Sequence, residues 1–207
     1  MVHLYCERGE PEVARELLER FAAVGESDSD EAAAGYRVYE ARTLRAEGRL
    51  REALATADAA LAIRGTVGMT SWGTKGGMAE ALESSLALGD MAKTHELLGI
   101  LDALRPGELT PIFRAIRARF RGRLAAAAGD SAAGAHFQEA ERVYEGLGTP
   151  FHLAVTQLEH AEWLDAQGEA GDAAALQSAA REVFDRLGAM PWLERADRLQ
   201  VGREVSG

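Results

Sequence analysis

Cysteine and long hydrophobic runs are scarce in this sequence, and each shortage excludes a class of structure. Cys6 is the single cysteine, so no disulfide can form within the chain. This agrees with a reducing compartment and predicts a cytoplasmic protein. No apolar run approaches the roughly 18 residues that a membrane-spanning helix needs, and the N-terminal residues lack the basic and apolar segments of a signal peptide. We therefore expect no membrane contact.

Positive charge and aromatic residues are also in short supply. The formal net charge is −10, which disfavours nonspecific binding to nucleic acid and to anionic membranes. Aromatic residues make up 6% of the chain, whereas hydrophobic residues as a whole make up 47%, with alanine abundant among them. A core of this kind suits closely packed helices, so we predict a folded helical protein without direct nucleic-acid contacts.

What the sequence has in plenty is self-similarity. A helix end, a glycine turn and a second helix recur at intervals of 39, 41, 40 and 39 residues. The turn glycines are Gly9, Gly48, Gly89, Gly129 and Gly168. A near-constant period in this range is the signature of a stacked-repeat protein.

The pattern predicts an all-α fold, a right-handed α-solenoid of about five antiparallel helical hairpins. The array should cover residues 1–201, begin in the middle of a repeat and end in a cap helix over 190–201, with a disordered tail over 202–207. Ser29 or Asp30, Thr110 and Thr149 are expected N-caps. The expected helices span residues 11–24, 30–47, 50–63, 78–88 (starting as early as 70), 91–104, 111–128, 131–147, 151–167, 171–187 and 190–201.

Five positions after each turn glycine stands a small residue, and this resembles the tetratricopeptide repeat. These residues are Ala14, Ala53, Thr94, Gly134 and Ala173. The resemblance implies that the two helices of each hairpin touch closely there. The stretch AREVFDRLGAMPWLERADRL over 180–199 also resembles the end of the repeat arrays in bacterial LuxR-type activators and cyclase-linked signalling ATPases. Their ATPase, cyclase and helix-turn-helix domains have no counterpart in these residues, so those activities are not implied.

Polar residues on the first helices of the hairpins are the candidates for a binding groove, because such helices line the concave face of a solenoid. The basic helix over 111–128 contributes three arginines that share one face. The alternative is that these arginines pair with Glu139, Glu141, Glu145 or Glu159. The candidate groove residues are Arg37, Arg42, Arg45, Arg114, Arg117, Arg121, His152 and Gln157.

The stretch GMTSWGTKGG over 68–77 superficially resembles a phosphate-binding loop. Its lysine, Lys75, stands one position too late after Gly73, and no strand precedes it, so a helix start is the favoured interpretation. His152 and His160 are eight residues apart, too far for one metal ion without further ligands. We expect no cofactor, no metal and no enzymatic activity.

The function that these patterns favour is a noncatalytic protein–protein interaction scaffold, the regulatory repeat region of a bacterial signalling or transcription-regulating ATPase. Its partner would be a protein or peptide, another domain of a longer parent chain, or a second copy in a homodimer. The alternative is a small-molecule-sensing repeat domain with its ligand near the irregular segment 65–77. Trp72, Trp163 and Trp192 are either core residues or anchors that line a binding site.

Overall fold

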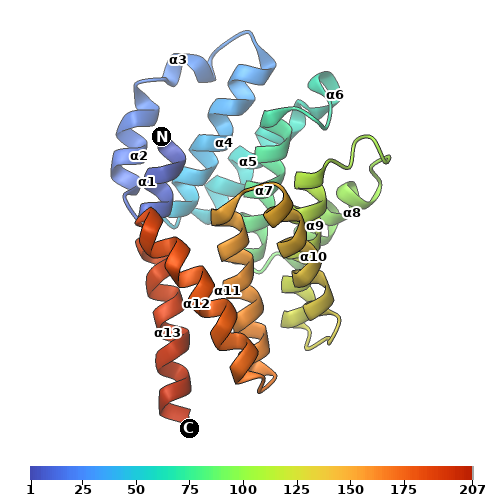
Figure 1. Cartoon of the computed structure of the whole chain (residues 1–207). Helices are drawn as coiled ribbons and strands as arrows, with labels where there is room; N and C mark the ends of the chain where they lie inside the picture. Colours follow the sequence, from blue (N-terminus) through green and yellow to red (C-terminus); the bar gives the residue numbers. More distant parts are fainter. Residues whose placement is uncertain (207) are drawn as a thin grey trace. The chain divides into compact units, whose positions relative to one another are not determined.

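The computed structural model describes residues 1–206 of the chain, and the side chains of residues 1–199. Its regular structure is helical, and the described residues contain no strand, which confirms the all-α prediction. None of the helices within this range is long and apolar enough to cross a membrane. The chain divides between Thr110 and Pro111 into two compact units, each with its own packed helices. Figure 1 shows the helices in chain order.

The first unit is built from helical pairs. α1 packs on α2, α4 on α5 and α7 on α8, and α7 also packs against α4 and α5 (Figure 1). Short helices α3 and α6 follow α2 and α5. The bounds are α1 (Val2–Arg8), α2 (Pro11–Glu19), α3 (Ala22–Gly25), α4 (Asp30–Ala46), α5 (Leu50–Ala62), α6 (Arg64–Val67), α7 (Trp72–Ala87) and α8 (Met91–Asp102).

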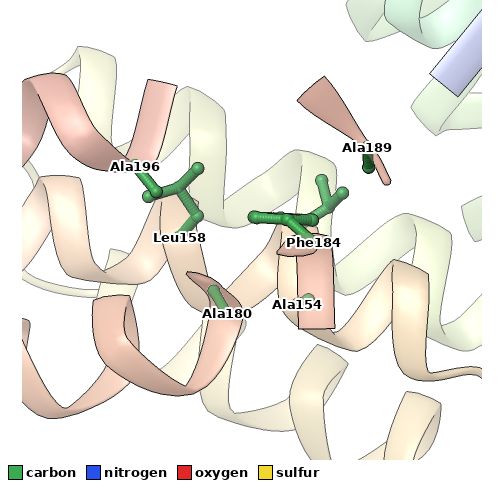
Figure 2. Packing of buried hydrophobic residues seen from close by; sticks show 7 residues of the cluster. Ala154, Leu158, Ala180, Phe184, Ala189 and Ala196 are labelled. Carbon is green, nitrogen blue, oxygen red and sulfur yellow. The ribbon is translucent and has the colours of Figure 1, made fainter. Parts of the chain in front are cut away.

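The second unit repeats this arrangement. α9 packs on α10 and α11 on α12, while α13 lies against α12. Phe184 and Leu158 fill the centre of one buried cluster, and alanines let the neighbouring backbones approach them (Figure 2). The bounds are α9 (Pro111–Ala127), α10 (Ala133–Gly146), α11 (Pro150–Ala166), α12 (Ala170–Leu187) and α13 (Met190–Ser206).

The glycines of the repeated motif form the turns between paired helices. Each has a positive φ, between 69° and 84°, in the left-handed region of backbone conformation that residues with a Cβ rarely adopt. Glycine at this point lets the chain leave one helix and start the next within two to five residues. The five are Gly9, Gly48, Gly89, Gly129 and Gly168.

The structure corrects several predicted helix boundaries. The predicted helix over 11–24 is broken: α2 ends at Glu19, and α3 begins after Phe21. α13 continues to Ser206, so it extends through most of the predicted tail over 202–207, of which Gly207 lies outside the described residues.

The Ser29 cap is confirmed by its side chain, which accepts a hydrogen bond from the Ala32 N–H. Thr149 is the N-cap residue of α11 and is followed by proline, as predicted, but its side chain makes no capping hydrogen bond. The Thr149 hydroxyl donates to the Tyr144 carbonyl of the preceding helix instead of capping its own. Thr110 has a buried hydroxyl oxygen with no hydrogen-bond partner in the described part of the chain.

The glycines at the start of α7 allow close helix packing. A Cβ at Gly73 would stand 2.8 Å from the Ala34 Cβ, and one at Gly76 would stand 2.6 Å from a methyl carbon of Val38. Gly77 faces Ala60 on α5 in the same way, at 3.2 Å. These three glycines therefore bring the backbone of α7 against α4 and α5, and the glycine-rich stretch is explained without a phosphate ligand.

Candidate functional site

The first unit contains an apolar pocket of about 510 Å³. Its wall is formed by α1, α2, α3, α4 and the first residue of α7, so residues far apart in the sequence meet around it. Nearly all of its lining is carbon, and the one charged residue in it is Glu31. The lining residues are Met1, Val2, Leu17, Leu18, Phe21, Val24, Glu31, Ala32, Gly35, Tyr36, Tyr39 and Trp72.

The N-terminus of α7 fixes one side of the pocket. The Glu31 carboxylate accepts hydrogen bonds from the backbone N–H groups of Trp72 and Gly73, at 3.1 and 3.3 Å from Oε1. Ser71 adds an N-cap, because its hydroxyl accepts from the Thr74 N–H. A carboxylate is stabilised at this end of a helix by the unpaired N–H groups and the helix dipole. The glycine-rich segment thus binds an anion of the protein itself.

Trp72 forms the side of the pocket that this helix start positions. Its indole lies over Gly35, where a Cβ would stand 3.2 Å from the ring, and its centroid is 5.1 Å from that of Tyr39. Although these contacts hold the ring in place, Trp72 is 48% exposed. An aromatic ring that is positioned by packing and still half in water is a typical binding anchor.

The opposite side depends on the break between α2 and α3. Gly25, at the end of α3, lies against the ring of Tyr36, since a Cβ there would stand 2.8 Å from it. Burial raises the pKa of the Tyr36 hydroxyl, and the nearby Glu40 carboxylate raises it further. The hydroxyl is therefore neutral at physiological pH and can donate a hydrogen bond inside an otherwise apolar site.

Large apolar side chains surround the opening. Phe21 is 55% exposed and Met1 is 75% exposed, and Val24 is also exposed. Val13 on α2 is exposed as well. Scattered exposed apolar residues are ordinary, whereas a cluster around a concave pocket is typical of an interaction site.

The candidate groove arginines of the first unit are bonded within the protein. Arg42 Nε and Arg45 Nε donate to the two oxygens of Glu80 at 2.6 and 2.9 Å, and Glu80 is 1% exposed. Arg42 also bonds the His3 ring on α1, and His3 pairs with Glu7. The result is a partly buried network that ties α1, α4 and α7 together.

The second unit contains a matching pair. Arg119 donates through Nε and Nη2 to the two oxygens of Glu159, both at 2.7 Å, and both residues are buried. Arg123 approaches the same carboxylate at 3.4 Å. Of the three candidate arginines on the basic helix, Arg114 donates at 3.2 Å to Glu139, one of its predicted partners. Glu159 is instead bonded by Arg119 and Arg123.

The remaining candidate residues are partly buried and do not line the pocket. Arg37 lies on α4, while Arg117 and Arg121 lie on α9. His152 stacks on Tyr144 with ring centroids 5.5 Å apart, and Gln157 is half-buried on α11. Three of the eight predicted groove residues thus lie in the first unit and five in the second, and none of them lines the pocket.

The pairs Arg42–Glu80 and Arg123–Glu159 occupy the same repeat positions, which sequence reasoning missed. Glu80 and Glu159 each stand nine residues before a turn glycine, and Arg42 and Arg123 each stand six residues before one. If the repeats are aligned on their glycines, an arginine on one first helix is followed by a glutamate on the first helix of the next repeat. These positions are therefore occupied by contacts that join neighbouring hairpins.

Other polar groups in the second unit are also engaged in packing. His160 Nδ1 lies 2.8 Å from Glu141 Oε1, and the ring stacks on Phe137 and leans against Trp163. Trp192 stacks on Phe184 inside the core. Within the range that the structure describes, no three His, Cys, Asp or Glu side chains are grouped so that they could hold a metal ion.

The pocket of the first unit is thus the strongest candidate site. Comparison of the chain with models of known protein families and with curated protein sequences found no match.

Proposed function

We propose that this chain is a noncatalytic interaction module that binds an apolar segment of a protein partner in the pocket of the first unit. The single observation that carries the proposal is the pocket itself, with the half-exposed rings of Trp72 and Phe21 on its two sides. Apolar pockets with a few aromatic anchors are the usual binding sites of proteins without a catalytic centre.

The pocket supports this function better than the arginine groove does. Arg42, Arg45 and Arg114 bond carboxylates of their own chain, and a partner would have to break those bonds. The pocket requires no such exchange, because its lining is apolar and its rim is already exposed. Binding there gains mainly from removing carbon from water.

The wider setting is proposed from the repeats. An array of tetratricopeptide-like hairpins in a right-handed solenoid, with a terminal stretch over 180–199 like that of bacterial signalling ATPases, supports a regulatory role in a cytoplasmic signalling or transcription-regulating protein. In that setting the pocket's partner is another protein, a second copy, or a domain of a longer parent chain.

A small-molecule sensor is the second candidate, and the pocket volume favours it specifically. Pockets that hold drug-sized ligands have volumes of about 300–1,000 Å³, and this one has about 510 Å³. Trp72, the one residue of the segment 65–77 in the pocket lining, also supports this candidate.

One selection experiment tests the leading function. The whole chain is used to select binders from a displayed library of random helical peptides, and the enriched peptides are then measured against a Phe21→Ser variant by fluorescence anisotropy. Phe21 is 55% exposed, so the substitution should leave the fold intact. We expect enriched peptides whose affinity falls at least about tenfold in the variant, the scale of an interface anchor.

Two results would contradict the proposal. The first is a selection that enriches no peptide above background. The second is a set of peptides that bind wild type and Phe21→Ser equally. A thermal-shift screen against metabolites separates the alternative, since only a sensor is stabilised by a small ligand, by an amount that grows as RT ln(1 + [L]/Kd).

A further inference from the structure

The elements that surround the pocket differ from the rest of the chain in their charge. Residues 10–31, which supply α2, α3 and the start of α4, contain eight acidic residues against two arginines. This stretch alone therefore has a net charge of −6 within a chain whose formal net charge is −10. An apolar pocket is thus framed by a strongly acidic segment.

Two acids lie near a side chain of the pocket wall. Glu40 on α4 and, more weakly, Glu19 on α2 raise the pKa of the Tyr36 hydroxyl, whereas Arg15 lowers it. Arg15, which is on the same helix as Glu19, is bonded through Nε and Nη2 to the Glu47 carboxylate at 2.5 and 2.7 Å, so much of its charge is balanced. Carboxylates therefore outnumber arginines eight to two on the stretch that supplies α2, α3 and the start of α4.

The exposed apolar side chains extend beyond what a small enclosed ligand would cover. The exposed side chains of Met1, Phe21, Val24 and Trp72 all belong to the lining of the pocket, and they come from four separate places in the first unit. A partner that covers all four needs several large apolar groups in a row. An amphipathic helix supplies them at positions i, i+3, i+4 and i+7.

Resting on the proposed function, we infer that the partner segment is a basic amphipathic helix, with large apolar anchors that fill the pocket and flanking lysines or arginines that face the acidic frame. The apolar face supplies most of the affinity. The charges supply orientation, association rate and discrimination against acidic partners.

Two matched peptides test this inference. Both have about 16 residues, long enough for a helix to form on the surface, and the same leucine and tryptophan face. One has lysine and arginine on its flanks and the other has glutamate at the same positions. Binding of each labelled peptide to the whole chain is measured by fluorescence anisotropy, at low and at high salt.

We expect the basic peptide to bind, the acidic peptide to bind at least about tenfold more weakly, and high salt to reduce the difference, because salt screens exposed charges beyond about 8 Å. The double variant Glu19→Gln, Glu40→Gln should weaken the basic peptide by roughly 2- to 10-fold, the range for two exposed charge pairs. The control is Glu182→Gln with Glu194→Gln, which removes two exposed acids of the second unit. This control variant should bind the basic peptide with the same affinity as wild type.

Three outcomes would overturn the inference. Equal binding of the two peptides would show that charge does not select the partner. Display selection that yields pocket-dependent peptides without basic residues would leave the proposed function standing and refute only its basic partner. The third outcome is that a long-chain alkylammonium displaces the bound peptide, and that Glu19→Gln weakens binding of the alkylammonium but not of the peptide. This would show that the acidic frame binds a small lipophilic cation. A selection that enriches nothing would instead refute the proposed function.

Discussion

Glu80 bonds two arginines while its own side chain is almost completely buried. Replacing it with alanine leaves Arg42 and Arg45 without their shared carboxylate in a partly buried site. Removing one side of a buried ion pair costs about 3–5 kcal/mol. We expect Glu80→Ala to lower the free energy of unfolding by about 3 kcal/mol, measured by urea denaturation.

The matched control is Glu52→Ala. Glu52 also pairs with an arginine, Arg49, at 2.5 Å, but both side chains are exposed. Solvent screens such pairs, so this variant should keep the wild-type unfolding midpoint. If Glu52→Ala and Glu80→Ala shifted the midpoint equally, burial would not be what makes the Glu80 network important.

Glu7 gives the first unit a dependence on acid. Burial by itself would raise the pKa of Glu7, but the hydrogen bond from His3 and the charges of Arg42 and Arg45 outweigh it and lower the pKa to about 2. Because the folded state binds its proton less readily than the unfolded state, the stabilisation is complete above pH 4.5 and is lost as pH falls toward 2.

Glu7→Gln should remove that part of the acid sensitivity. The pKa difference corresponds to up to about 3 kcal/mol, so wild type should lose more stability than the variant between pH 4.5 and pH 2 in urea titrations at each pH. His3, Arg42, Arg45 and Glu80 surround the group. Parallel curves for the two proteins would mean that Glu7 does not titrate as this network requires.

At the scale of the element, the start of α7 depends on glycine for its distance from α4. A methyl group at Gly73 would stand 2.8 Å from the Ala34 Cβ, which has no rotamer by which to move away. We expect Gly73→Ala to destabilise the protein by about 1–3 kcal/mol, the usual cost of overpacking, in thermal or urea unfolding.

Gly99 provides the opposite case inside α8. Nothing lies within 4 Å of a Cβ built there, so alanine meets no neighbour. Gly99→Ala should stabilise the protein by about 0.5–1 kcal/mol, because alanine has the higher helix propensity. Opposite signs for the two variants would support close packing as the role of Gly73, and equal signs would contradict it.

The same elements show how far the sequence predicts the structure. The turn glycines repeat at a near-constant period, and a turn depends on residues that are close in sequence. The helices of each hairpin can therefore be predicted from the sequence alone. The break after Glu19 has no such signal, since neither proline nor glycine stands between it and Ala22. It depends on α3 packing over Tyr36, a tertiary contact that periodicity does not contain.

Most of the pocket could not be predicted for the same reason, although Trp72 was a candidate anchor. The wall that Glu31 and Trp72 form joins residues more than 40 positions apart, which the helix start of α7 brings together. From the sequence, the predicted arginines look like exposed surface residues, because the carboxylates that pair with them are brought close only by the tertiary fold. Only the regular place of Glu80 and Glu159 before their turn glycines was available in advance.

At the scale of the whole chain, the two units have separate buried clusters. Phe184 belongs to the second unit and is completely buried in one cluster with Leu158 (Figure 2). Trp192 stacks on its ring. In helical arrays each element is stabilised by its neighbours, and regions can open separately. Damage to this cluster should therefore stay in the second unit.

Phe184→Ala tests this separation. Truncating a buried phenylalanine costs about 3–5 kcal/mol, and we expect hydrogen exchange measured by mass spectrometry to show the loss in α11, α12 and α13. Amides of α4, α5 and α7 should keep their wild-type protection, because their contacts are to one another. Gly73→Ala should give the reverse pattern. Uniform loss of protection across both units in either variant would mean that the chain unfolds as one cooperative body, and the pocket would then depend on the second unit as much as on its own walls.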